Sequence, residues 1–193
     1  MMLKKIILII ILAFTGSFVN GESLVFPPYY HSYGIRKATP GHLFMILKGA
    51  TKFDDPQGLA TARLDSWEDP TVKKDDDEVV VYGVNSGRHQ IIYNTSMYAL
   101  ALYGEKGSSD GRFLYPKGIA ANSKGDVYVA DSGNNRIVRL FNPKKGLLWV
   151  TALKTESGSD SMNGPIRVAI DETGGVYATD AVNKKIFVFN KVN

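Results

Sequence analysis

The 193-residue chain contains no cysteine and only three histidines. The missing thiols exclude disulfides, thiolate metal sites, a cysteine nucleophile and an acylated cysteine anchor. The histidines, His31, His42 and His89, form neither an H-x-H nor an H-E-x-x-H spacing, so the pattern disfavours zinc. We therefore expect a fold that is held by its apolar core and binds no metal or other cofactor.

Long apolar runs are also missing. The longest, Ile6–Phe14, has about nine residues, well short of the roughly 18 to 20 that cross a bilayer. It follows two lysines and precedes the small and polar residues 15–21, which is the pattern of a secretory signal peptide. We expect residues 1–21 to be removed before Glu22 and the protein to be exported, to a periplasm or outside the cell. An uncleaved membrane anchor is the alternative.

No basic tract or stripe stands out either. The formal net charge is +4, and two of these charges belong to the lysines of the leader. A mature chain with so small an excess lacks the electrostatic footprint of a nucleic-acid-binding protein. We expect the partner to be a protein or a cell-surface polymer and not a nucleic acid, and the composition favours a bacterial origin.

A repeated pattern is what the sequence does have. Its clearest copy, residues 113–141, reads FLYPKGIAANSKGDVYVADSGNNRIVRLF, and the pattern returns 49 residues later and, less completely, 46 residues earlier. Matching positions in the second and third copies include Pro116 and Pro165, Gly125 and Gly174, Tyr128 and Tyr177, and Asp131 and Asp180. Self-similarity at this period indicates a repeat architecture.

Each copy is divided into short strands by turn residues. In the second copy the pattern predicts strands at 118–121, 127–130, 137–141 and 147–153, with tight turns at 122–126 and 131–135. Four antiparallel strands in a unit of roughly 45 residues are typical of a propeller blade.

The unit P-x-G-I-A…G-x-V-Y-V-A-D-x-x-N-x-R-I closely resembles the NHL repeat. The resemblance implies an all-β fold, a β-propeller that usually has six blades in this family. It favours a binding platform. Some similar propellers are lyases or hydrolases with a metal in the central channel, so the fold alone does not decide the function.

The predicted organisation has an extended segment rich in Pro and Tyr at 22–41, followed by a spare outer strand at 42–49. Three blades follow at 53–103, 113–153 and 162–190, the first with an insertion at 63–77. Three blades cannot easily close a ring, and the last copy lacks a fourth strand. One hypothesis is a homodimer that completes a six-bladed ring, and the alternative is a truncated propeller.

The candidate binding residues lie where the inner strands begin and in the turns on that same face. They are Gln57, Lys117, Arg167, Arg88 and His89. Arg167 replaces a glycine of the other two copies, and its guanidinium could clamp a carboxylate or simply bond to neighbouring carbonyls. We expect His89 to be exposed on a loop, where a histidine could ligate a metal or move a proton but most often does neither.

Trp67, between carboxylates in the insertion, is a candidate for docking a partner. Three functions stay open. The first is an exported, non-catalytic module that binds a protein or a surface polymer. The second is a propeller enzyme, a lyase or hydrolase with a channel-bound metal, although the pattern assigns no catalytic or metal residue. The third is a structural component of a larger assembly.

Overall fold

The computed structural model describes residues 24–25, 36–37, 53–67, 79–96, 99–144, 146–155 and 161–189. The chain divides into two compact units, residues 1–51 and 52–193. In the first unit, β1 (Leu24–Val25) pairs antiparallel with β2 (Arg36–Lys37). The predicted leader and the predicted outer strand at 42–49 lie outside the described residues.

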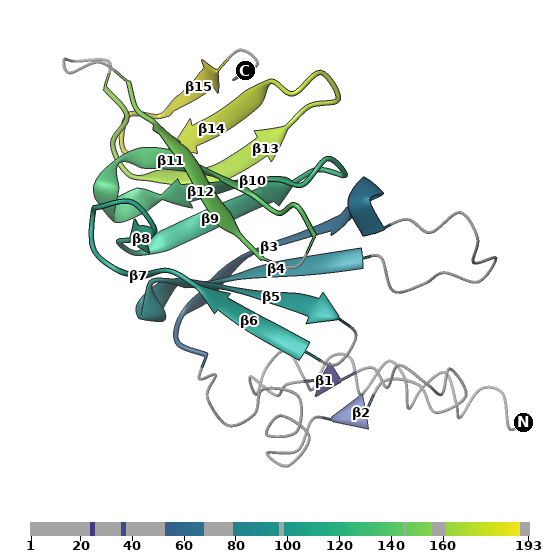
Figure 1. Cartoon of the computed structure of the whole chain (residues 1–193). Coiled ribbons are helices and arrows are strands. Elements are labelled where there is room, and N and C mark those ends of the chain that lie inside the picture. The colour runs from purple at the N-terminus through teal and green to yellow at the C-terminus, as the bar shows by residue number, and fades with distance from the viewer. Residues whose placement is uncertain are drawn as a thin grey trace, which may run out of the picture. The chain divides into compact units, whose positions relative to one another are not determined.

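Three antiparallel sheets, here called blades 1, 2 and 3, follow one another along the second unit (Figure 1). Blade 1 consists of β3 (Pro56–Arg63), β4 (Val79–Asn85), β5 (Gln90–Ser96) and β6 (Ala99–Tyr103). Blade 2 consists of β9 (Pro116–Ala121), β10 (Asp126–Asp131), β11 (Arg136–Phe141) and β12 (Leu148–Leu153). Blade 3 has β13 (Pro165–Ile170), β14 (Val176–Asp180) and β15 (Lys185–Phe189) in its described part. The predicted all-β, propeller-type fold is confirmed.

Short elements complete the described chain. Between blades 1 and 2, β7 (Glu105–Lys106) and β8 (Arg112–Phe113) pair in parallel. Three single turns of 3-10 helix, η1 (Asp65–Trp67), η2 (Ser86–Arg88) and η3 (Ser132–Asn134), are the described helices. None of them is long and apolar enough to cross a membrane.

The inner strands of the three blades begin in the same way. The first residue of each is a proline that pairs with the last residue of the second strand, and the pairs are Pro56 with Asn85, Pro116 with Asp131, and Pro165 with Asp180. One extra residue then enters the inner strand before regular pairing resumes, which is a β-bulge. The residue before each proline has a positive φ, and these residues are Asp55, Tyr115 and Gly164. Because a bulge twists the strand and re-aims its side chains, each inner strand starts with the same local irregularity.

Neighbouring inner strands touch each other through their backbones, so that β3, β9 and β13 lie side by side (Figure 1). A Cβ atom on Gly58 would lie 2.5 Å from the Lys117 carbonyl oxygen. A Cβ atom on Gly118 would lie 2.8 Å from the Arg167 Cα atom and from the Ile166 carbonyl oxygen. The two glycines therefore allow an approach that no larger residue would permit.

Two apolar clusters hold the blades together. Successive strand residues point to opposite faces of a sheet, so β10 contributes Val127 and Val129 to the cluster with blade 1, and Tyr128 and Ala130 to the cluster with blade 3. These four side chains are almost completely buried. Blade 2 is thus covered on both of its faces.

Two tyrosine hydroxyls accept hydrogen bonds in the first of these clusters. The Asn142 side-chain amide donates to the Tyr82 hydroxyl at 2.8 Å, and the Leu147 backbone N–H donates to the Tyr93 hydroxyl at 3.3 Å. Burial raises the pKa of Tyr82 to about 12. The Tyr82 phenol therefore stays neutral and keeps its hydrogen-bonding partner.

Because the inner strands are in close contact, we expect the addition of one methyl group at Gly118 to destabilise the fold. Gly118→Ala should lower the free energy of unfolding by about 1–3 kcal/mol, because the new atom would overlap backbone that cannot rotate away. Gly146→Ala is the matched control, since its Cβ would meet nothing within 4 Å, and it should change stability by less than about 0.5 kcal/mol. Urea unfolding followed by tryptophan fluorescence measures both variants. Equal transition midpoints for the two would show that the strands are free to separate.

Candidate functional site

Each blade fixes the start of its inner strand with the side chain at the end of its second strand. That side chain accepts a backbone N–H from the residue two positions before the proline. The three hydrogen bonds are Asp54 N to Asn85 Oδ1 at 2.7 Å, Leu114 N to Asp131 Oδ1 at 2.7 Å, and Asn163 N to Asp180 Oδ2 at 2.6 Å. We call this bond the entry clamp. It holds the rim of inner-strand starts in one geometry.

In blade 2 the entry clamp includes a buried ion pair. Arg136 Nε lies 2.7 Å from Asp131 Oδ2, and both side chains are almost wholly buried. The other guanidinium N–H groups donate to the carbonyls of Ser108, Ser109 and Arg112 in the linker from blade 1. The pair therefore ties the linker to the clamp.

The charge of Asp131 is balanced within the fold. Burial raises its pKa, while hydrogen bonds from Leu114, Asn134 and Arg136 act in the opposite direction. The Arg136 guanidinium also lies over the Trp149 ring, 5.2 Å from its centre. The charge and the N–H donors of Arg136 are thus engaged by other groups of the fold, which gives this residue a structural role.

His89 differs from the sequence expectation, because it is buried and not an exposed loop residue. It follows η2 with a left-handed backbone, and its Nδ1 accepts the Tyr115 backbone N–H at 3.0 Å. Asn135 has the same backbone conformation at the same repeat position, and its Oδ1 accepts the Gly164 N–H at 2.8 Å. His89 thus replaces an asparagine that joins one blade to the next.

The protonation of His89 follows from this role. Burial, and then the nearby Lys106, lower its pKa, while Asp131 and Asp54 oppose the change. A proton on Nδ1 would displace the Tyr115 N–H. The neutral ring with its proton on Nε2 is therefore the form that fits the fold.

The three rim candidates come together through their backbones. Gln57, Lys117 and Arg167 stand at the starts of the adjacent strands β3, β9 and β13. Gln57 and Arg167 are exposed and Lys117 is partly exposed. Within the described ranges neither cation forms an ion pair, whereas Gln57 donates to the Asp55 carboxylate. The rim thus presents two cations whose charges no described carboxylate neutralises.

The other two candidates make contacts within the fold. Arg88 lies 4.0 Å from the Asp54 carboxylate at the surface, a weak pairing. The half-buried Trp67 packs against the apolar cluster of blades 1 and 2, and its indole N–H donates to the Lys144 carbonyl. Ligand binding by Arg88 and His89, and partner docking by Trp67, stay predictions.

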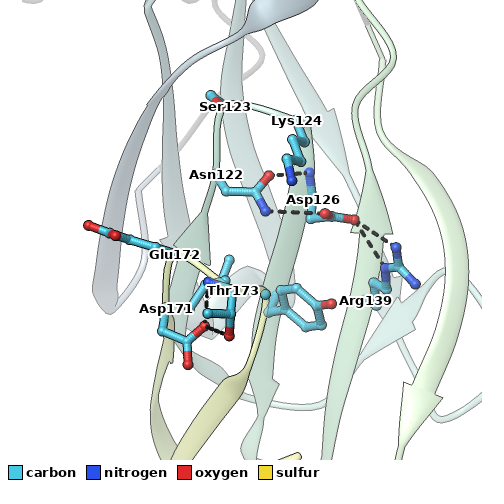
Figure 2. A pocket seen from close by; sticks show the side chains of 11 residues that line it. Asn122, Ser123, Lys124, Asp126, Arg139, Asp171, Glu172 and Thr173 are labelled. Carbon is cyan, nitrogen blue, oxygen red and sulfur yellow. Dashed lines mark hydrogen bonds and ion pairs between the residues drawn. The ribbon is translucent and has the colours of Figure 1, made fainter. Parts of the chain in front are cut away.

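A polar hollow of about 330 Å³ lies at the other end of the strands, between the β9–β10 turn and the β13–β14 turn (Figure 2). Sequence reasoning did not identify it. In each turn one side chain caps the loop: Asn122 Oδ1 accepts the Asp126 N–H at 3.0 Å, and Asp171 Oδ1 accepts the Gly175 N–H at 2.8 Å. The N-S-K-G-D and D-E-T-G-G segments, which occupy the same place in the two copies, are the only signal for it in the sequence.

Three of the charged side chains that line the hollow, Asp126, Arg139 and Asp171, have partners within the fold. Asp126 binds Arg139 at 2.9 Å, and Asp171 accepts hydrogen bonds from Thr173, Gly175 and Tyr177. These bonds lower the pKa of Asp171 to about 2. In the part of the chain that the structure describes, no group of three or more His, Asp or Glu side chains could hold a metal ion.

Stacked antiparallel meanders, two of four strands and one of three described strands, with contacting inner strands define a propeller-type repeat protein. Residues 113–140 match the NHL repeat. The NHL repeat predicted from the sequence is confirmed at these residues, and the chain contains an NHL repeat.

Two relatives and one solved structure are similar to parts of the chain. It is 32% identical over 93 residues to the human "NHL repeat-containing protein 3", which covers 46% of this chain and 26% of the relative. It is 40% identical over 50 residues to the B-box type zinc finger protein ncl-1 of Caenorhabditis elegans, which covers 26% of this chain and 5% of that protein. A catalytically inactive virginiamycin B lyase from Staphylococcus aureus with quinupristin shares 15% identity at a TM-score of 0.40, over 58% of this chain and 38% of the lyase. The chain thus spans about a quarter of the human relative's length.

Removal of the buried carboxylate should be costly. Asp131→Ala is expected to lower the free energy of unfolding by about 3–5 kcal/mol, because Arg136 would remain buried without a counter-charge. Asp126→Ala breaks the more exposed pair with Arg139 and should cost about 1 kcal/mol. Urea denaturation of the two variants compares them directly. A cost for Asp131→Ala no larger than that for Asp126→Ala would contradict the clamp's role.

We expect the buried His89 to make the stability of the fold depend on pH. Because its folded-state pKa lies below the unfolded value of about 6.5, its contribution is present above that pH and is lost as the pH falls below it. His89→Asn keeps an acceptor and should flatten the profile, whereas His89→Leu leaves the Tyr115 N–H unpaired and should cost about 1–3 kcal/mol at neutral pH. Urea unfolding of the parent and of both variants at neutral and mildly acidic pH tests this. An unchanged profile in His89→Asn would rule out the acceptor role.

Proposed function

We propose that the chain is an exported, non-catalytic binding module of the NHL-propeller type that takes a protein segment or a cell-surface polymer at its inner-strand rim. Support for export comes from the leader pattern of residues 1–21. Support for binding comes from the repeat family and from the chemistry of the rim.

The observation that carries this proposal is the pair of cations at the rim. Lys117 and Arg167 stand on adjacent inner strands, and the close contact at Gly118 fixes the distance between their backbones. Arg136 and Arg139, in contrast, each form an ion pair with a carboxylate of the fold. A ligand carboxylate could bind the two rim cations without breaking an ion pair among the described residues.

The chemistry of these side chains selects the ligand class. A guanidinium offers two parallel N–H donors to one carboxylate, and an ammonium adds a point charge beside it. The amide of Gln57, on the next strand, could bind a hydroxyl or carbonyl of the same ligand. An acidic peptide segment and a polymer of acidic sugars share this chemistry.

A binding titration tests the proposal. A fluorescein-labelled oligoglutamate peptide is titrated with the chain at low salt, and polygalacturonate is added as a competitor. Lys117→Gln and Arg167→Gln should each weaken binding about tenfold, the effect of losing one charge-assisted hydrogen bond of about 1.5 kcal/mol. Lys124→Gln, an exposed lysine in the β9–β10 turn at the far end of the inner strand, is the matched control.

The outcomes separate the alternatives. Displacement by polygalacturonate favours the surface polymer, and binding of the peptide that polygalacturonate does not displace favours the protein segment. Equal affinities of the parent, the two rim variants and Lys124→Gln would place binding elsewhere. If neither probe binds, the rim does not take a carboxylate ligand.

A further inference from the structure

The segment that leads into blade 3 is tied to the fold at four consecutive residues, 161–164. Each of them is hydrogen-bonded through its backbone to a side chain outside the segment. The partners are Asn183 for Ser161, Thr155 for Met162, Asp180 for Asn163, and Asn135 for Gly164. The backbone is therefore restrained on both sides of the peptide bond between Asn163 and Gly164.

This peptide bond joins the pair of amino acids that is most prone to deamidation. Asn–Gly occurs twice in the sequence, and the other occurrence, residues 20–21, lies in the predicted leader. In this reaction the backbone nitrogen after the asparagine attacks the side-chain Cγ, and a glycine there has no Cβ to hinder the approach. The equivalent pairs of blades 1 and 2 are Asp54–Asp55 and Leu114–Tyr115, which contain no asparagine. Of the three blades, blade 3 alone thus has an Asn–Gly pair before its inner strand.

The two reacting groups of the pair are held differently by the fold. The Asn163 side chain is exposed, and among the described residues it has no hydrogen-bonding partner. The Gly164 nitrogen, which must lose its proton before it attacks, donates that proton to Asn135 Oδ1 at 2.8 Å. Because this hydrogen bond exists only while the nitrogen keeps its proton, it stabilises the unreactive form.

We propose that Asn163 is a site of spontaneous deamidation and that the hydrogen bond from Gly164 to Asn135 controls its rate. The Gly164 nitrogen gives up its proton and forms a bond to Cγ, the bond from Cγ to Nδ2 breaks, and Nδ2 leaves as ammonia with that proton. Water then opens the cyclic imide. Addition of water at Cγ gives aspartate, and addition at the main-chain carbonyl gives isoaspartate, in which the chain runs through Cγ. Water is the one co-reactant, and no group is oxidised or reduced.

The modification changes the start of blade 3. Both products carry a carboxylate in place of a neutral amide. In isoaspartate the chain also has one more atom between the two nitrogens that donate to Asp180 and Asn135, so both hydrogen bonds cannot keep their geometry. Pro165, the first residue of β13, follows directly. The site therefore lies where the entry clamp of blade 3 and its bond to blade 2 meet, and the inference does not depend on the ligand proposed for the rim.

Peptide mapping of the aged protein measures the reaction. The folded chain is incubated at mildly alkaline pH and digested with trypsin, and mass spectrometry follows the fragment of residues 155–167, in which Asn163 is the only asparagine and glutamine is absent. A synthetic peptide of the same sequence gives the rate without the fold. The folded parent should deamidate at least about tenfold more slowly than the peptide, because its restraining hydrogen bonds have to break first.

Variants at Asn135 test the control by the hydrogen bond. Asn135→Ala removes the acceptor and should deamidate about five- to tenfold faster than the parent. Asn135→Asp keeps an oxygen acceptor and should retain the slow rate. Asn134→Ala is the matched control in the same turn, because that asparagine donates to Gly107 and Asp131 and not to Gly164, and it should also react at the parent's rate. Circular dichroism checks that each variant is folded.

Three results would overturn the proposal. They are a parent that deamidates as fast as the peptide, an Asn135→Ala variant that is no faster than the parent, and an Asn134→Ala variant that is accelerated as much as Asn135→Ala. The deamidated protein, separated by anion exchange, should unfold at a lower urea concentration than the unmodified protein. An unchanged midpoint would contradict the expected loss of the entry clamp of blade 3.

Discussion

The entry clamp is the interaction on which the arrangement of the blades depends. A side-chain oxygen at the end of the second strand accepts the N–H of the residue two positions before the proline, through Asn85, Asp131 and Asp180. The bond fixes where the inner strand begins, and with it the bulge that follows the proline. Because such a bond is local to one blade, each repeat can set its own inner strand before the blades stack.

The stacking of the blades uses a second set of bonds that runs from one repeat to the next. The side chain after the η turn accepts the N–H that precedes the next blade's proline, from His89 to Tyr115 and from Asn135 to Gly164. The Ser132 hydroxyl also donates to the Pro165 carbonyl. Together with the backbone contacts at the two inner glycines, these bonds place the starts of the inner strands in one row.

The two ends of the strands consequently have different chemistry. At the rim, Lys117 and Arg167 project from backbones that the clamps and bulges hold in place, and no described carboxylate pairs with them. At the hollow, Asp126 and Asp171 are held by their own arginine, hydroxyl and backbone partners. At the rim an anionic ligand would meet two cations that pair with no described carboxylate, whereas the carboxylates of Asp126, Asp171 and Glu172 line the hollow and would repel it. The rim is therefore the better candidate.

The sequence by itself determined the repeat, the strands and turns of each copy, and the residues that start the inner strands. The repeat is visible as self-similarity at shifts of 46 and 49 residues. The strands and turns depend on alternation and turn residues, which are visible in a single copy. Only the tertiary structure decided that His89 is buried as an acceptor, that Trp67 packs on the core, and that two equivalent turns enclose a hollow. Those outcomes depend on how blades stack, because the partners belong to different repeats, as His89 and Tyr115 do at a separation of 26 residues.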